Sequence, residues 1–215
     1  MFAGIVKGRG RIAALERLGG DLRITVDLAG LDLGLLDAGA SVAVNGVCLT
    51  ALEPVDGLLR ADVSTETLSV TTLQSATVGD AVNLETSLRL GDPVDGHLVY
   101  GHVDAVGSIR SIEPQARSWR IGIAVPTALG RYIAAKGSIA MDGVSLTVNA
   151  ADPSGFEVNV IPHTRAVTTI EHYLVGTTVN IEVDMMARYA ERLVAQDAPS
   201  ITLEKLKQHG FTGDE

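Results

Sequence analysis

The chain has 215 residues, of which 46% are hydrophobic and 23 are glycine. This length suffices for one large core or for two small cores of about 90–100 residues each. The 17 basic and 26 acidic residues give a net charge of −9 without a basic stripe, so we expect no nucleic-acid partner and no anionic membrane. The single cysteine, Cys48, excludes an intramolecular disulfide and a CxxC metal site.

The first residues, MFAGIVK, lack the basic-then-apolar layout of a signal peptide. Apolar runs are interrupted well before the ~18 residues that a transmembrane helix needs. We therefore expect a cytoplasmic protein.

An internal repeat organises the chain. Residues 41–50 (SVAVNGVCLT) recur as residues 138–147 (SIAMDGVSLT), an offset of 97 with six identities in ten. At the same offset, residues 70–85 match residues 167–182 at eight of sixteen positions, where unrelated segments would match at roughly one in sixteen. The repeat predicts a first domain over residues 1–97, a second over 98–185 and a tail over 186–215.

Each half is predicted to be all-β. Short runs rich in Val, Ile and Thr lie at residues 41–44, 81–85, 120–125, 156–161 and 178–183. Turn-forming pairs such as Asn45-Gly46 and Asp142-Gly143 separate them. Many short strands without a long helical period indicate a small closed barrel in each half, with brief helical stretches at residues 31–38 and 126–135.

The tail is predicted to be helical. Apolar side chains follow the spacing i, i+3, i+4, i+7, i+8 at Met186, Tyr189, Ala190, Leu193 and Val194. Pro199 ends this helix, and a second one follows near residues 201–209. The first helix packs either on its own barrel or on another subunit; we favour another subunit, because the helix follows two complete barrels.

Several common catalytic motifs are absent. There is no GxxxxGK[ST] phosphate loop and no HExxH, and the GRGRI at residues 8–12 lacks the third glycine of a dinucleotide fingerprint. The five histidines do not lie at metal-ligand spacing from Cys or carboxylates, so no metal is expected. A Ser-His-Asp triad is possible on paper, but no nucleophile-elbow motif supports it.

Agreement and disagreement between the halves indicate candidate sites. Thr50 matches Thr147, and Thr67 matches Thr164; such hydroxyls suit a flat heterocycle, although they could equally satisfy strand ends and turns. Two positions differ: His102 stands opposite Ile5, and Ser145 opposite Cys48. An imidazole in one half only is a candidate proton carrier near neutral pH.

At these residues the chain resembles the riboflavin synthase family. The family opening Met-Phe-Thr-Gly-Ile-Val corresponds to residues 1–6 here, and further hallmarks correspond to SVAVNGVCLT (41–50), GHLVYGHV (96–103), KGSIAMDGVSLT (136–147) and IPHT (161–164). The resemblance covers essentially the whole chain. It implies two tandem six-stranded Greek-key β-barrels and a homotrimer held by C-terminal helices.

The resemblance also implies a reaction. Two molecules of 6,7-dimethyl-8-ribityllumazine bind per active site, one in the first barrel of one subunit and one in the second barrel of a neighbour. A four-carbon unit passes between them, giving riboflavin and 5-amino-6-(ribitylamino)uracil, with flavin as product and no cofactor. Lumazine synthase is a further partner that the resemblance implies.

The motifs carry residue roles with them. The residues that would line the first pocket are Gly4, Ile5, Val6, Cys48, Leu49, Thr50, Asp62, Val63, Ser64, Thr65, Glu66 and Thr67. Those that would line the second are Gly101, His102, Val103, Ser145, Leu146, Thr147, Asn159, Val160, Ile161, Pro162, His163 and Thr164, with Lys136 reaching across the interface. The catalytic candidates are His102, Ser145 and Thr147 for proton handling, Cys48 near the acceptor ring, and Asp142 and Asp184 for orientation or charge.

Ala3 replaces the usual threonine of the opening motif, which either lowers activity or leaves the role to a backbone group or water. This departure favours the main alternative, a lumazine- or flavin-binding antenna protein without catalysis. Because both halves keep their motifs, we favour catalysis. A flavin reductase is disfavoured, since no nicotinamide-binding domain follows the barrels.

Overall fold

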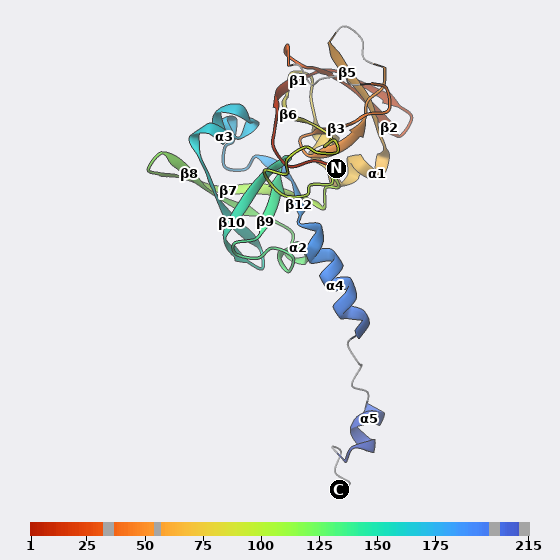
Figure 1. Cartoon of the computed structure of the whole chain (residues 1–215), viewed down its shortest axis with the longest axis vertical. Coiled ribbons are helices and arrows are strands. Elements are labelled where there is room, and N and C mark those ends of the chain that lie inside the picture. Colours follow the sequence, from red (N-terminus) through yellow and green to blue (C-terminus); the bar gives the residue numbers. More distant parts are fainter. Residues whose placement is uncertain (32–36, 54–56, 198–202, 211–215) are drawn as a thin grey trace. The chain divides into compact units, whose positions relative to one another are not determined.

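In a computed structural model, residues 1–31, 37–53, 57–197 and 203–210 are described, and they form two units, Met1–Met185 and Met186–Glu215. The first unit holds two six-stranded antiparallel sheets (Figure 1). The predicted all-β fold with two repeated halves is confirmed. Among the described residues, no helix is long and apolar enough to cross a membrane.

The first barrel contains strands β1 (Gly8–Leu18), β2 (Asp21–Asp27), β3 (Ser41–Val44), β4 (Val47–Thr50), β5 (Leu58–Val63) and β6 (Ala81–Thr86), with helix α1 (Thr65–Val70) and the 3-10 turn η1 (Thr72–Ser75) before β6. Its sheet order is β4-β3-β6-β1-β2-β5. One isolated bridge, Ala51 to Ala61, joins the two ends of this sheet. The predicted helical stretch at residues 31–38 lies mostly outside the described residues.

The second barrel contains strands β7 (Ala105–Gln115), β8 (Ser118–Ala124), β9 (Ser138–Met141), β10 (Val144–Asp152), β11 (Gly155–Val160) and β12 (Thr178–Val183), with helices α2 (Thr127–Gly130) and α3 (Pro162–Val167) and the 3-10 turn η2 (Thr169–His172). These strands close into a barrel in the order β10-β11-β8-β7-β12-β9, which is the cyclic order of the first barrel. The expected helix at residues 126–135 is one short turn, α2.

The cores follow from period-2 alternation. Along β2 the burial alternates, with Leu22, Ile24 and Val26 almost fully buried and their neighbours facing out. Each barrel has its own cluster of buried aliphatic side chains. A third, small cluster of Phe2, Ala43, Val99 and Ala140 lies between the barrels, so the first unit is one packed body with two cores.

The matching hairpin turns meet where the two barrels touch. Asn45-Gly46 and Asp142-Gly143 all have positive φ, which is the two-residue hairpin geometry that Asn-Gly and Asp-Gly favour. A Cβ added to Gly46 would lie 2.6 Å from the backbone N of Gly143, so only glycine permits this approach.

The second unit contains helices α4 (Met185–Asp197) and α5 (Leu203–Gln208). The apolar side chains Met186, Tyr189, Leu193 and Val194 of α4 are 61–73% exposed. The helix therefore presents the apolar stripe that its sequence spacing predicted.

Candidate functional site

The predicted site residues lie where two neighbouring strands stop pairing and diverge, at the same place in each barrel. We call each of these places a strand split. In the second barrel, the pairing of β10 with β11 ends at Val148 opposite Val158, so residues 145–147 and 159–161 continue on the two sides of the split. In the first barrel, Ala51 pairs with Ala61, and residues 48–50 and 62–64 continue in the same way. The two bridges differ by the repeat offset of 97, so the barrels carry matching splits.

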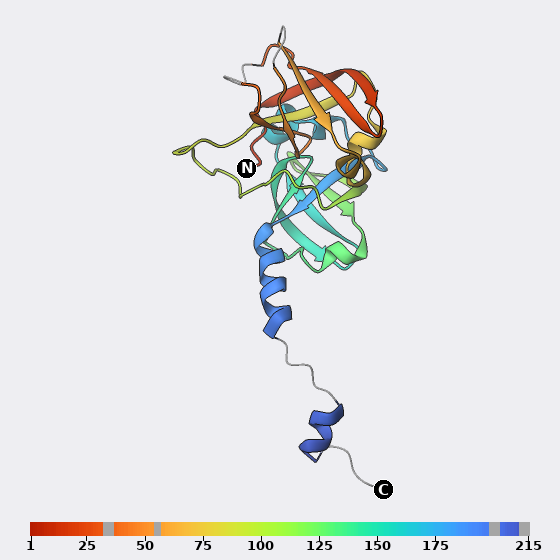
Figure 2. The same ribbon diagram turned by 90° about the vertical axis from the view of Figure 1, so that its right-hand side faces the viewer.

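Two segments outside the strands, residues 4–6 and 101–103, cross to the opposite barrel, and we call them the crossover segments. The Ser145 N–H in β10 donates to the Gly4 carbonyl at 2.8 Å, and the Cys48 N–H in β4 donates to the Gly101 carbonyl at 2.9 Å. Val6 packs on the core of the second barrel and Val103 on the core of the first. Figure 2 shows the N-terminal residues beside the yellow-green connection that follows β6, which they meet through the Phe2–Val99 bridge.

The contacts of these segments differ from the predicted grouping, while the assignment of residues to the two pockets stays a prediction. Gly4, Ile5 and Val6 were expected with Cys48, and Gly101, His102 and Val103 with Ser145; each segment instead lies over the other barrel. Internal duplication alone could not reveal the exchange, because a segment that stays on its own barrel and one that crosses have the same sequence.

Glycine is required at both crossing points. Gly4 and Gly101 have φ of +72° and +77°. A Cβ on Gly4 would lie 2.6 Å from Ser145 Cβ, and one on Gly101 would lie 2.5 Å from Cys48 Cβ. Positive φ and backbone-to-side-chain contact both exclude larger residues, so each crossover segment covers the side chain at which the two halves differ.

Ser145 is paired with a histidine that the sequence did not single out. His97 Nδ1 lies 2.7 Å from Ser145 Oγ, and a Cβ on the preceding Gly96 would also contact Ser145. Burial lowers the pKa of His97, and the nearby Asp184 carboxylate partly opposes this. The lowered pKa favours the neutral imidazole, which is the form that can accept a proton. The two glycines that flank residues 97–100 were the available signal.

His102 lies on the other crossover segment. It follows Gly101, which contacts Cys48, and its ring centroid is 6.0 Å from that of Tyr100. The imidazole is exposed, as is the Thr147 side chain in β10. The structure thus brings His97, not His102, to Ser145, and it places His102 beside the Cys48 split.

The segments after β5 and β11 have local partners. Arg23 donates to both Asp62 oxygens, at 2.7 and 3.0 Å, and this hydrogen-bonded ion pair lowers the pKa of Asp62. Ser64 caps α1 by accepting from the Thr67 N–H, and Thr65 binds Asp21. Glu66 is exposed.

In the second barrel, Val160 is buried like its match Val63, whereas Asn159 and His163 are exposed and Ile161 is 54% exposed. Leu146 packs on the core, as Leu49 does in the first barrel. Lys136 is exposed with φ of +69°. The exposed members are free to contact a ligand; the buried ones shape the barrel behind them.

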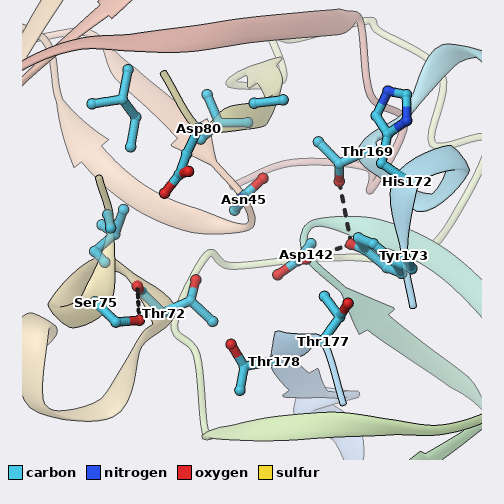
Figure 3. A pocket seen from close by; sticks show the side chains of 15 residues that line it. Asn45, Thr72, Ser75, Asp80, Asp142, Thr169, His172, Tyr173, Thr177 and Thr178 are labelled. Atoms are coloured by element: carbon cyan, nitrogen blue, oxygen red, sulfur yellow. Dashed lines mark hydrogen bonds between the residues drawn. The ribbon is translucent and has the colours of Figure 1, made fainter. Parts of the chain in front are cut away.

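Asp142 lies in a different place, a cavity of about 290 Å³ between the barrels (Figure 3). Its carboxylate accepts from the Asn180 N–H at 2.7 Å and from the Tyr173 hydroxyl, which also contacts Thr169. Burial raises the pKa of Asp142 to about 7, although both hydrogen bonds oppose the shift. These side-chain contacts lie within the second barrel, whereas the Asp142 carbonyl accepts from the Asn83 side chain of the first barrel at 3.0 Å. The catalytic role expected of Asp142 stays a prediction.

Two glutamates went unnoticed in the sequence. Glu85 at the end of β6 and Glu182 in β12 are matching positions, and both are only 4% exposed. Identity of a charged residue in both halves, within buried strands, was the signal that could have found them. Among the described residues, no group of three or more His, Cys, Asp or Glu could hold a metal ion.

Comparison with known proteins decides the family. The Lumazine binding domain family matches residues 3–87 and 100–184, which are the two barrels. Riboflavin synthase of Photobacterium phosphoreum is 42% identical over 98% of this chain and 99% of its own, and that of Mycobacterium tuberculosis (strain H37Rv) is 44% identical over 90% and 98%. The chain belongs to the riboflavin synthase family.

Solved structures agree with the fold of this riboflavin synthase family member. A crystal structure of LumP complexed with riboflavin has a TM-score of 0.79 at 23% identity, covering 86% of this chain and all of that one. LumP complexed with 6,7-dimethyl-8-(1'-D-ribityl) lumazine has a TM-score of 0.77. The similarity to LumP shows that the two folds are alike.

Proposed function

We propose that the chain catalyses the dismutation of two molecules of 6,7-dimethyl-8-ribityllumazine to riboflavin and 5-amino-6-(ribitylamino)uracil. Family membership over nearly the full length supports this reaction. One observation carries it: two matching strand splits exist, each covered by a crossover segment, but with different reactive groups. Two like pockets suit two identical substrates, and the different groups suit a donor and an acceptor.

The second-barrel split would activate one substrate. Transfer of the four-carbon unit requires loss of a proton from the 7-methyl group of a lumazine. Ser145 Oγ, 2.7 Å from His97 Nδ1, can pass that proton to the neutral imidazole. A positioned base of this kind contributes typically about 10²–10⁴-fold. Thr147, on the same strand and exposed, would bind the ring, and Asp184 would favour the imidazolium that forms.

The first-barrel split would hold the acceptor. Cys48 is half-buried beneath Gly101, and His102 follows on the same segment. Thr50 and the exposed side chains after β5 would bind the heterocycle and ribityl chain. Much of the rate should come from holding two substrates face to face.

A reaction between the two pockets requires that they approach each other. We propose a homotrimer in which the first-barrel pocket of one subunit faces the second-barrel pocket of a neighbour, with Lys136 near that interface. The exposed apolar stripe of α4 supports subunit association. Association with lumazine synthase and a cytoplasmic location stay predictions.

Turnover of the purified protein tests the reaction. Incubated with 6,7-dimethyl-8-ribityllumazine alone, it should release riboflavin in half the molar amount of lumazine consumed, with no cofactor added. Stoichiometric binding without conversion would instead favour the antenna-type carrier and would direct attention to Ala3. Consumption that depends on a nicotinamide cofactor would favour a reductase.

A further inference from the structure

The two crossover segments are each fastened by a buried glutamate of the barrel that they leave. In the second barrel, Glu182 Oε1 accepts from the Tyr100 N–H at 2.6 Å, and Oε2 accepts from the N–H groups of Gly101 and His102 at 2.9 and 3.1 Å. Gly101, the middle one of these three residues, lies against Cys48 of the first barrel. Glu182 therefore holds the backbone that covers Cys48.

Glu85 holds the matching segment with fewer contacts. Its Oε1 accepts from the Ala3 N–H at 2.8 Å, and the N–H groups of Gly4 and Ile5 also face the carboxylate, but its buried Oε2 has no partner at hydrogen-bond geometry within the described chain. A cavity of about 180 Å³ lies beside it, lined among others by Ala3, Ile5 and Lys7. Because buried carboxylate oxygens are nearly always hydrogen-bonded, this cavity suits a small hydrogen-bond donor, the size of water, that completes the Glu85 carboxylate.

A carboxylate suits this task better than an amide. All the groups that Glu182 meets on the segment are N–H donors, and an ionised carboxylate accepts on both oxygens. A glutamine would direct its NH₂ group at one or two of these donors. Burial raises the pKa of both glutamates, that of Glu182 to about 7, and the facing N–H groups oppose the shift.

We propose that Glu85 and Glu182 are positioning residues, each of which holds a crossover segment over the pocket of the opposite barrel. Glu182 closes the segment on Cys48 with three hydrogen bonds. Glu85 closes the segment on Ser145 through its hydrogen bond to the Ala3 N–H and the nearby N–H groups of Gly4 and Ile5, and a water-sized donor in the cavity beside Ala3 completes its second oxygen. The functional part of this inference rests on the proposed dismutation; the crossed coupling itself does not.

Cys48 reports on the crossed coupling without any substrate. It is the single cysteine and is half-buried beneath Gly101, so its alkylation by iodoacetamide measures how often the segment lifts. We expect Glu182→Gln to speed alkylation about 10-fold, the effect of losing one or two buried hydrogen bonds. Glu85→Gln, the matched control in the other half, should change it less than about twofold.

Equal acceleration in both variants, or none in Glu182→Gln, would overturn the proposal, since a general loosening of the fold has no preference for one segment. Alkylation is measured well below each variant's melting temperature. If Glu182→Gln does not fold, Glu182→Asp, whose shorter side chain cannot reach all three N–H groups, should give an intermediate acceleration; an unchanged rate in Glu182→Asp would also overturn it.

Turnover of the Glu85→Gln variant then tests whether Glu85 positions the segment over Ser145. We expect Glu85→Gln to lower kcat by about 10-fold or more, because the segment over Ser145 is displaced, while alkylation of Cys48 is unchanged. Unchanged kcat would overturn the role of Glu85. If the unsubstituted protein shows no turnover, the proposed function fails, but the alkylation result still decides whether the glutamates position the segments.

Substitution of Ala3 tests the cavity. A serine there would add a hydroxyl within the cavity that Glu85 lines, and we expect Ala3→Ser to raise the melting temperature by about 2–4 °C. Ala3→Val adds volume without a donor and should lower it or leave it unchanged. In a Glu85→Gln background the advantage of serine should shrink. A valine variant as stable as the serine variant would contradict a donor in this cavity.

Discussion

Ser145 and Cys48 occupy the same position of the two halves and the same place in the two barrels, under Gly4 and Gly101 respectively. Their different chemistry is what makes two like pockets unlike. A serine hydrogen-bonded to a histidine can relay a proton, whereas a half-buried thiol is an adaptable packing group. One residue difference therefore distinguishes a pocket that handles a proton from a pocket that only binds its substrate.

Ser145→Ala is expected to lower kcat by about 10²–10⁴-fold, because the His97 imidazole loses its relay to the substrate. Binding of riboflavin should weaken far less, since the barrel and the covering segment remain. Cys48→Ser, which places the residue of the second half in the first, is the matched control and should lower kcat by less than about 10-fold. Steady-state kinetics and fluorescence quenching of riboflavin measure the two effects.

A Cys48→Ser variant as slow as Ser145→Ala would show that both pockets need their native groups for chemistry. His97→Ala should reproduce the loss of Ser145→Ala, and His102→Ala tests the remaining histidine. If His102→Ala costs more turnover than His97→Ala, the base lies on the other segment and the relay assigned to Ser145 is wrong.

The buried Asp142 predicts a pH dependence of stability. Its pKa rises from 3.8 to about 7 on folding, so between these values the folded chain binds a proton that the unfolded chain has released. The free energy of unfolding therefore falls as pH rises through this window, by at most about 4–5 kcal/mol at ~1.4 kcal/mol per pKa unit.

Asp142→Asn introduces the residue of the matching turn, where the Asn45 side chain accepts from the Asn83 N–H as Asp142 accepts from Asn180. We expect its melting temperature to vary less between about pH 4 and pH 7 than that of the unsubstituted protein. Some pH dependence of the melting temperature should persist, because burial also raises the pKa of Glu182. Tyr173→Phe keeps the carboxyl and should keep the slope. A variant with an unaltered slope would show that Asp142 does not titrate in this range.

At the scale of elements, the crossover segments matter most, and sequence reasoning reached them only in part. The glycines were recognisable as sites of close approach, and the strands 41–44 and 178–183 were predicted with the bounds that the structure shows. The barrel to which each segment binds was not predictable, because it depends on the contacts of Cys48 with Gly101 and of Ser145 with Gly4, between residues far apart in the chain, which the repeat pattern leaves ambiguous.

Gly101→Ala should detach its segment from the first barrel. The added Cβ would lie 2.5 Å from Cys48 Cβ, on a residue with φ of +77°. We expect a lower melting temperature and at least a 10-fold rise in KM. A tenfold loss of affinity corresponds to ~1.4 kcal/mol of binding free energy. Gly79→Ala is the control, since φ there is +98° but nothing lies within 4 Å. Equal effects would attribute the loss to backbone strain alone.

At the scale of the whole molecule, the repeat of 97 residues predicted two similar halves and the strand and turn pattern predicted a barrel in each. The helix after the barrels was predicted from the spacing of its apolar residues. Composition and repeat could not supply the buried polar contacts between the barrels, such as Asn83 with Thr169 and Asn180 with Thr72, because these depend on how two folded barrels pack. The family resemblance supplied the reaction; the pairing of His97 with Ser145 came from the fold.

The exposed stripe of α4 predicts a change in assembly. Leu193→Glu places a charge on a side chain that is 65% exposed within one subunit and that we expect to be buried between subunits. Light scattering should show a shift from trimer to monomer with both barrels still folded. Arg192→Glu, on the neighbouring position of the same helix, should leave the trimer intact. A trimeric Leu193→Glu variant would assign the assembly to other surfaces.

The most direct test of a site shared between subunits is complementation. Thr50→Tyr should block the first-barrel pocket and Thr147→Tyr the matching second-barrel pocket, so each variant alone should be inactive with 6,7-dimethyl-8-ribityllumazine. When the two variants are co-expressed and purified together, some interfaces pair an unblocked first barrel with an unblocked second barrel. Random mixing should restore up to about a quarter of the unsubstituted activity. Mixed assemblies that stay inactive would contradict a reaction between pockets of neighbouring subunits.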